Sequence, residues 1–109
     1  MNNSLQSEVT QLHAEICGGL ADPTRIMILY ELSSTSKNVS ELCSALDMAQ
    51  PSISRHLKIL RERGMVTTER QGTIVNYSLS DARLIEALDL LRAVMREGLQ
   101  KRAALVEVI

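Results

Sequence analysis

The sequence contains no phenylalanine and no tryptophan, and it has two tyrosines and two histidines among its 109 residues. No nucleophile, base and orienting group occur at the spacing of a catalytic motif, and the two histidines stand apart, so the sequence argues against an enzyme. It has no apolar run long enough to cross a bilayer, and its first residues lack the basic segment and apolar core of an export signal. We therefore expect a cytoplasmic protein that has no membrane partner.

Cysteine and net charge are also scarce. Cys17 and Cys43 are expected to be thiols rather than a disulfide in an intracellular chain, which leaves room for redox or metal chemistry. The net charge of -1 is unlike that of a general polyanion binder. The charges are nevertheless segregated, because residues 1–50 hold two basic and six acidic side chains, whereas residues 51–73 hold five basic and two acidic ones. Positive charge is therefore expected to gather where residues 51–73 fold.

The composition indicates a single domain that spans residues 1–109. Hydrophobic residues make up 45% of the chain and charged residues 23%, which is typical of globular rather than disordered proteins. A domain of this size leaves much of its surface exposed, so association with a second chain is expected from size alone.

Two short helices joined by a tight turn are predicted in the middle of the chain. The first covers residues 39–46, where apolar side chains recur at helical spacing and Asn38 stands as the cap. The second begins at Gln50-Pro51, since proline in a first turn removes a donor that would be unpaired anyway, and it stops at Gly64. Its residues predicted to point inward are Ile53, Leu57 and Leu60.

A two-stranded hairpin is predicted to follow this pair. Residues 65–70 and 73–79 are rich in β-branched residues and alternate in polarity, and they flank Gln71-Gly72 as the turn. A helix pair followed by such a hairpin is a winged helix-turn-helix. The expected fold is thus mainly α with a small β-hairpin (α+β), in the order α-α-α-α-β-β-α.

Four separated motifs resemble the ArsR/SmtB family of bacterial repressors. They are LADPTR at 20–25, SISRHLKILR at 52–61, RQG at 70–72 and YSL at 77–79. The resemblance covers about residues 12–100. It implies a homodimeric transcriptional repressor that binds double-stranded operator DNA at an inverted repeat and is released by an inducer.

The second helix of the pair is predicted to face DNA, because its outward side is polar and cationic. The residues predicted to lie in the major groove are Gln50, Pro51, Ser52, Ser54 and Arg55. Those predicted to hold the DNA backbone are Lys58, Arg61, Arg70 and Gln71. The alternative is a winged helix that docks another protein, and the basic excess of residues 51–73 favours DNA.

Two helices at the ends of the chain are predicted to join two copies of it. The first, at about residues 5–17, is expected to end at Gly18-Gly19, and the last, at about residues 81–106, to begin at a cap on Ser80 or Asp81. Their apolar residues form a band too wide for one small domain to bury. The residues assigned to the dimer interface are Leu5, Val9, Leu12, Leu84, Leu88, Leu91 and Met95.

The sequence leaves the identity of the inducer open. Arsenite-responsive members of the resembled family have CVCDLC at the start of the first helix of the pair, whereas residues 38–43 here read NVSELC. Zinc-responsive members use one Asp and three His in the last helix, and the matching residues here are Asp81, Arg83, Val94 and Glu97. We therefore predict no zinc site in the last helix.

Cys43 and Cys17 are the candidate sensing residues, through oxidation, reactive sulfur, or a thiophilic metal or metalloid. His13 lies four residues before Cys17, a helical spacing that can present two ligands to one ion. Both cysteines are also consistent with small buried hydrophobes, in which case the repressor has no cysteine-based sensing. No other cofactor is expected.

Overall fold

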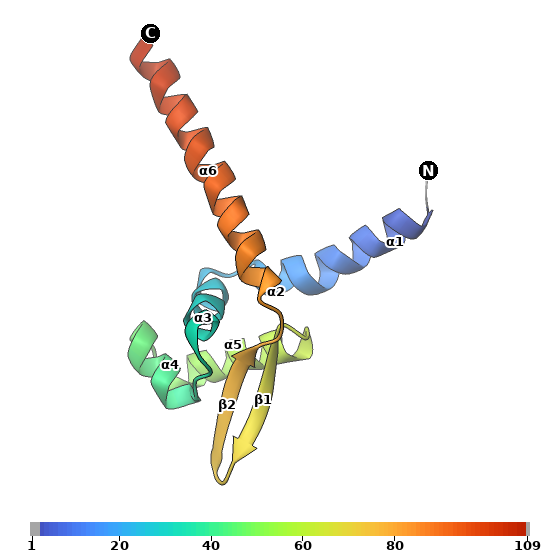
Figure 1. The fold of residues 1–109 in the computed structure, drawn as a ribbon, viewed down its shortest axis with the longest axis vertical. Helices are drawn as coiled ribbons and strands as arrows, with labels where there is room; N and C mark the ends of the chain where they lie inside the picture. The colour runs from blue at the N-terminus through green and yellow to red at the C-terminus, as the bar shows by residue number, and fades with distance from the viewer. Residues whose placement is uncertain (1–2, 109) are drawn as a thin grey trace.

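The computed structural model describes residues 3–108 (Figure 1). Its elements are α1 (Asn3–Leu12), a π-helical turn η1 (His13–Cys17), α2 (Gly18–Leu20), α3 (Pro23–Ser34), α4 (Val39–Leu46), α5 (Gln50–Glu62), β1 (Val66–Gln71), β2 (Ile74–Leu79) and α6 (Arg83–Val108). A central body contains α3, α4 and α5, the hairpin of β1 and β2 projects from one end of it, and α6 leaves from the other (Figure 1). The fold is the predicted winged helix-turn-helix. No helix within residues 3–108 is long and apolar enough to span a membrane.

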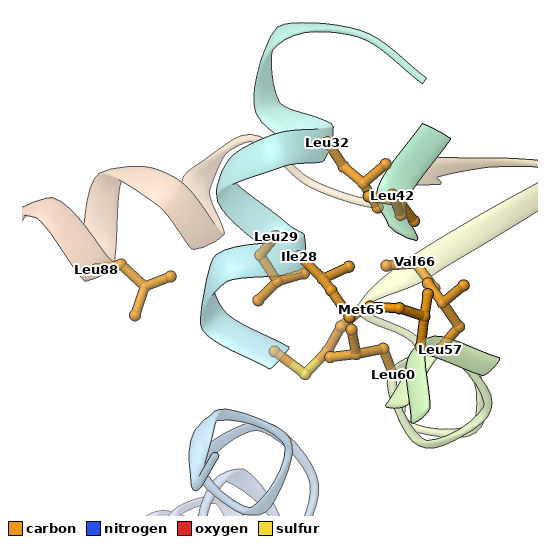
Figure 2. Packing of buried hydrophobic residues seen from close by; sticks show 10 residues of the cluster. Ile28, Leu29, Leu32, Leu42, Leu57, Leu60, Met65, Val66 and Leu88 are labelled. Atoms are coloured by element: carbon orange, nitrogen blue, oxygen red, sulfur yellow. The ribbon is translucent and has the colours of Figure 1, made fainter. Parts of the chain in front are cut away.

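The core lies between α3, α4, α5 and β1. Its fully buried side chains are those of Ile28, Leu29, Leu42, Ile53, Leu57, Leu60 and Met65. Figure 2 shows Ile28 of α3 beside Met65 and Leu60, Leu32 of α3 beside Leu42, and Leu88 pointing toward α3 from α6. Fully burying one Leu or Ile side chain contributes about 1.5 to 3 kcal/mol, so this cluster is the main source of the body's stability.

Three helices begin at a capping side chain, and two of these caps, Asn38 and Asp81, are among those predicted from the sequence. Asp22 Oδ1 accepts hydrogen bonds from the amides of Thr24 (2.8 Å) and Arg25 (3.3 Å) at the start of α3. Asn38 and Glu41 form a reciprocal capping box at α4, with both bonds 2.9 Å long. At the start of α6, Asp81 Oδ1 accepts from the Arg83 amide at 2.9 Å. These caps satisfy amides that a helix leaves unpaired at its first turn.

The expectation that Gly18-Gly19 ends the first helix is wrong. The helical path continues through η1 and α2 to Leu20, and Gly18 has helical dihedral angles of φ -60° and ψ -39°. The glycines serve close packing instead, since a Cβ added to Gly19 would lie 2.5 Å from Met65 Sδ. A glycine ends a helix when its backbone turns left-handed, which these two do not.

The hairpin is shifted by one residue from its predicted position. Gln71 lies in β1 and pairs with Ile74, so the turn consists of Gly72 and Thr73 rather than Gln71 and Gly72. Gly72 has a φ of +65°. That left-handed conformation is the one a two-residue hairpin turn requires, and it places Gln71 on the strand that carries Arg70.

Candidate DNA-binding interface

The helix α5, which we call the recognition helix because the sequence predicts that it faces DNA, has one fully buried side and one exposed side. Ile53, Leu57 and Leu60 are 0% exposed, as predicted. The predicted DNA-contacting residues on the other side are exposed, except for the half-buried Ser52: Gln50, Pro51, Ser54, Arg55, Lys58 and Arg61. Because the apolar side is locked into the core, the polar side has a fixed orientation toward solvent.

The turn between α4 and α5 and the end of α5 both rely on left-handed residues. Asp47 has a φ of +52°, and the Met48 amide donates to the Cys43 carbonyl at 3.1 Å. Gly64 has a φ of +71°, and the Met65 amide donates back to the Leu60 carbonyl at 2.9 Å. These bonds close the helix ends, so the length and direction of α5 are defined by local structure.

The wing, which is the hairpin of β1 and β2, is hydrogen-bonded to the chain just before α4. The Lys37 amide donates to the Tyr77 carbonyl at 3.0 Å and the Tyr77 amide donates to the Lys37 carbonyl at 2.8 Å. A cleft of about 400 Å³ lies between the start of α4, the start of α5 and the wing, and Gln50 is among its lining residues. The wing therefore flanks the recognition helix, with Arg70 and Gln71 exposed near its tip. Gln71 Oε1 accepts a 3.3 Å hydrogen bond from Asn76 Nδ2, which steadies that side chain.

The inner side of α5 carries a polar contact that sequence reasoning missed. Arg25 Nη1 lies 3.3 Å from His56 Nδ1, and the same guanidinium donates to the carbonyls of Gly19 (2.8 Å) and Gly18 (3.3 Å). An arginine can only donate, so His56 Nδ1 is the acceptor of this hydrogen bond, and His56 Nε2 lies 4.0 Å from Asp22 Oδ1. This network ties α5 to α3 and α2. The signal in the sequence was the LADPTR motif, which holds both Asp22 and Arg25.

The basic residues of 51–73 divide into two groups in the structure. Arg55, Lys58, Arg61 and Arg70 are exposed. Arg63 is half-buried, and its Nη1 donates to the main-chain carbonyls of Ala14 and Glu15 in η1. The positive surface predicted from this segment is thus formed by four side chains rather than five.

The predicted dimer residues also divide. Leu5, Val9 and Leu12 of α1 and Leu91 and Met95 of α6 are about half exposed or more, at 49% to 61%. Leu84 is half-buried and packs against the core of its own chain. Leu88 is only 5% exposed, because it faces α3, so its assignment to the dimer interface is corrected to the domain core. Other exposed apolar residues of α6 are Leu90, Val94, Leu99, Leu105 and Val106.

The two cysteines lie in different environments, and both are free. Cys17 is exposed in η1, so the interpretation of this residue as a buried hydrophobe is wrong. Cys43 is half-buried and packs against the core from α4, the helix that precedes the recognition helix. His13, the possible companion of Cys17, is exposed in the same π-helical turn. Within residues 3–108 there is no group of three or more His, Cys, Asp or Glu placed to hold a metal ion.

Comparisons with known proteins agree with this geometry. The family described as bacterial regulatory protein, arsR family, matches residues 22–68. The chain is 43% identical over 77 residues to the HTH-type transcriptional repressor SmtB of Mycobacterium tuberculosis, a match that covers 71% of this chain and 57% of that protein. It is 40% identical over 83 residues to the biofilm growth-associated repressor of Agrobacterium fabrum, which covers 73% and 71% of the two chains. The chain thus spans little more than half the length of SmtB.

A solved structure shares the fold. It is the homodimeric winged helix-turn-helix DNA-binding domain of Mb0332 from Mycobacterium bovis, with a TM-score of 0.77 and 24% identity. The match covers 93% of each chain, so the likeness includes the helices at both ends as well as the central body.

Proposed function

Because the chain belongs to the ArsR family of bacterial regulatory proteins, we propose that it is a transcriptional repressor that binds an inverted-repeat operator as a homodimer and leaves it when an inducer acts. The observation that carries this proposal is the outward side of α5, where polar and cationic side chains are exposed on a helix whose other side is fully buried. Two relatives, SmtB and the biofilm growth-associated repressor, are themselves repressors. The family is one of transcriptional regulators rather than enzymes.

On DNA, the front of α5 enters the major groove. Gln50 can pair with adenine and Arg55 with guanine through two hydrogen bonds each, which is the geometry of direct base readout. Lys58 and Arg61 lie further along the same exposed side and contact phosphates, while Arg70 and Gln71 on the wing reach the backbone beside the groove. Exposure of these side chains and the fastening of the wing by Lys37 and Tyr77 support this arrangement.

Dimerisation is supported by apolar surface that a single chain leaves open. Leu91 of α6 and Leu5 of α1 are 61% and 58% exposed, and both helices extend away from the body (Figure 1). Contiguous apolar surface of this kind on a soluble domain marks an interaction site. A two-fold dimer through α1 and α6 would present two recognition helices to an inverted repeat, with half-sites about one DNA turn apart or a multiple of that.

The inducing event proposed is thiol chemistry at Cys43, with Cys17 as a second participant. Peroxide, for example, would oxidise a thiolate to a sulfenic acid as the O–O bond breaks and hydroxide leaves. Cys17 is exposed and therefore accessible, whereas Cys43 contacts the core behind α5, so an adduct there would disturb the packing that orients Ser54 and Arg55. A thiophilic metal or metalloid is the second candidate inducer, and it would bind at the thiol of Cys43 or that of Cys17.

The DNA-binding proposal is tested by selection from a pool of random duplex DNA. The purified protein should enrich an inverted repeat, and its affinity for that duplex should fall steeply as the salt concentration rises, because phosphate contacts release counterions. Failure to enrich any duplex, or binding that is insensitive to salt, would leave the protein-docking module as the better explanation of the fold.

A further inference from the structure

Arg63 follows the recognition helix directly but turns away from its exposed side. Arg55, Lys58 and Arg61 are exposed, whereas Arg63 is half-buried with its guanidinium against the first helical segment. Its Nη1 donates to the carbonyl of Ala14 and, at 3.1 Å, to the carbonyl of Glu15. A side chain held in this way cannot also reach a DNA phosphate, so Arg63 has a different task from its basic neighbours.

The acceptors of Arg63 lie in the π-helical turn η1. A π turn changes which amide each carbonyl faces, and here the Gly18 amide is shared between the His13 and Glu15 carbonyls. Each carbonyl oxygen has two lone pairs, so Ala14 and Glu15 can accept from Arg63 in addition to their helical partners. Turns of this kind inside α-helices are often found at functional sites.

The glycine at the end of η1 makes room for the guanidinium. A Cβ added at Gly18 would lie 2.6 Å from Arg63 Nη1. Since Gly18 has ordinary right-handed helical dihedral angles, its backbone conformation does not itself require glycine. A side chain at residue 18 would displace the guanidinium, so glycine leaves the room that Arg63 occupies.

The turn η1, to which Arg63 is hydrogen-bonded, directly follows α1, and α1 carries an exposed apolar stripe of Leu5, Val9 and Leu12. On the proposed function, on which this inference rests, that stripe belongs to the dimer interface. We propose that Arg63 is a positioning residue. By fixing the end of the recognition helix to η1, and through it to α1, Arg63 sets the distance between the two half-sites that the dimer accepts. One base pair of spacing is about 3.4 Å along the duplex. A small loss of rigidity at the contact between Arg63 and η1 therefore changes which half-site spacings the dimer can bind.

The experiment measures spacing selectivity with Arg63→Gln and Gly18→Ala. The duplex is the inverted repeat selected by the wild-type protein, together with versions that have one base pair inserted or removed at the centre. Wild type should bind the altered duplexes about tenfold or more weakly, the factor that corresponds to 1.4 kcal/mol. Both variants should reduce that penalty to about threefold or less. Arg63→Gln removes the guanidinium, and Gly18→Ala displaces it while leaving its charge in place.

Matched controls separate positioning from charge and from folding. Arg61→Gln removes an exposed charge from the outward side of α5, so it should lower the salt slope by about 0.9 and keep spacing selectivity, whereas Arg63→Gln should leave the slope unchanged. Gly98→Ala, with no atom within 4 Å of the added Cβ, is the control for Gly18→Ala. If Arg63→Gln does not fold, Gly18→Ala decides.

The inference is overturned if both variants keep the wild-type penalty, or if Arg63→Gln lowers the salt slope as Arg61→Gln does. A wild-type protein that selects no inverted repeat overturns the proposed function and this inference together. Selection of an inverted repeat with unchanged selectivity in the variants overturns this inference alone.

Discussion

Arg55 leaves α5 one turn after Pro51 and lies nearly opposite the buried Leu57. Its guanidinium has no hydrogen bond or ion pair among those found within residues 3–108, so it is available for a base or a phosphate. Arg25 and Arg63 have the same side chain but are committed to main-chain carbonyls. Burial and nearby hydrogen-bond acceptors, rather than residue type, decide which arginines are available to contact DNA.

Replacing Arg55 with alanine should weaken operator binding without unfolding the protein. The expected loss is about 1 to 3 kcal/mol of binding free energy, which is typical of one specific contact. A fluorescence anisotropy titration at fixed salt measures it, with Arg96→Ala on α6 as an exposed-arginine control. Equal affinities for the parent and Arg55→Ala would remove Arg55 from the recognition surface.

Asp81 should make the stability of the protein depend on acid pH. The hydrogen bond from the Arg83 side chain, followed by the one from the Arg83 amide, lowers the pKa of Asp81 from 3.8 to about 2. A depressed pKa means that the ionised carboxylate stabilises the fold above its ordinary pKa, and that this contribution is lost as the pH falls through about 2.

Asp81→Asn, which keeps the cap but removes the charge, should therefore have a lower Tm than the parent near pH 6. The difference should shrink between about pH 4 and pH 2, because the parent carboxylate becomes neutral there. Thermal unfolding followed by circular dichroism measures it, with Glu97→Gln in α6 as the control. A Tm difference that stays constant down to pH 2 would show that the charge of Asp81 does not matter.

At the scale of elements, local signals were enough for the helix-turn-helix pair. α4 has the bounds predicted from its apolar spacing and its Asn38 cap, and α5 ends one residue before the predicted position. Gly64, which stops α5, is left-handed as a terminating glycine should be. Spacing, caps and stop residues all act within a few positions along the chain, which is why a sequence can reveal them.

Contacts between distant segments could not be predicted in the same way. Gly18 and Gly19 are read as a helix end locally, yet they are packed against Arg63 and Met65, which lie more than forty positions later. The contact between Arg25 and His56 spans 31 positions, and the spacing of apolar residues in α3 and α5 does not predict it. The exposed side of α5 was predictable because it follows from the buried side, whereas the direction of Arg63 was not.

The core behind α5 should respond strongly to a lost side chain. Leu57 is 0% exposed, so Leu57→Ala leaves a cavity and should cost about 2 to 5 kcal/mol of unfolding free energy. Chemical denaturation measures the loss, with Lys58→Ala on the exposed side as the control. A change below about 0.5 kcal/mol for Leu57→Ala would contradict this placement of α5.

The same packing gives a test of the sensing proposal. Cys43→Ser should bind DNA as the parent does but should release it less readily after peroxide, a polysulfide or arsenite, because no adduct can then form behind α5. Cys17→Ser should have a smaller effect of the same sign. Operator release measured after each treatment distinguishes them, and release from both variants equal to that of the parent would make the cysteines structural residues only.

For the whole molecule, the important feature is the contrast between a packed body and two projecting helices. The body buries Leu88 of α6, while Leu90, Leu91 and Val94 just beyond it are 61% to 69% exposed. Tyr30 links the two regions: its hydroxyl donates to Asp89 at 2.6 Å, and Arg92 lies 5.4 Å from the centre of its ring. The start of α6 thus belongs to the body, and the exposed apolar surface that we propose as the dimer interface begins just beyond Leu88.

Leu88 and Leu91 should therefore give different results when they are changed. Leu91→Glu places a charge on the exposed apolar surface, where a dimer could not pair it, so the dimer should dissociate while each chain stays folded. Leu88→Ala opens a cavity in the chain's own core, so it should lower the free energy of unfolding by about 2 to 5 kcal/mol without adding charge to the interface. Sedimentation measures the first effect and denaturation the second. A wild-type protein that sediments as a monomer at micromolar concentration would end the dimer proposal, whereas a Leu91→Glu dimer as stable as the wild type would move the interface away from this part of α6.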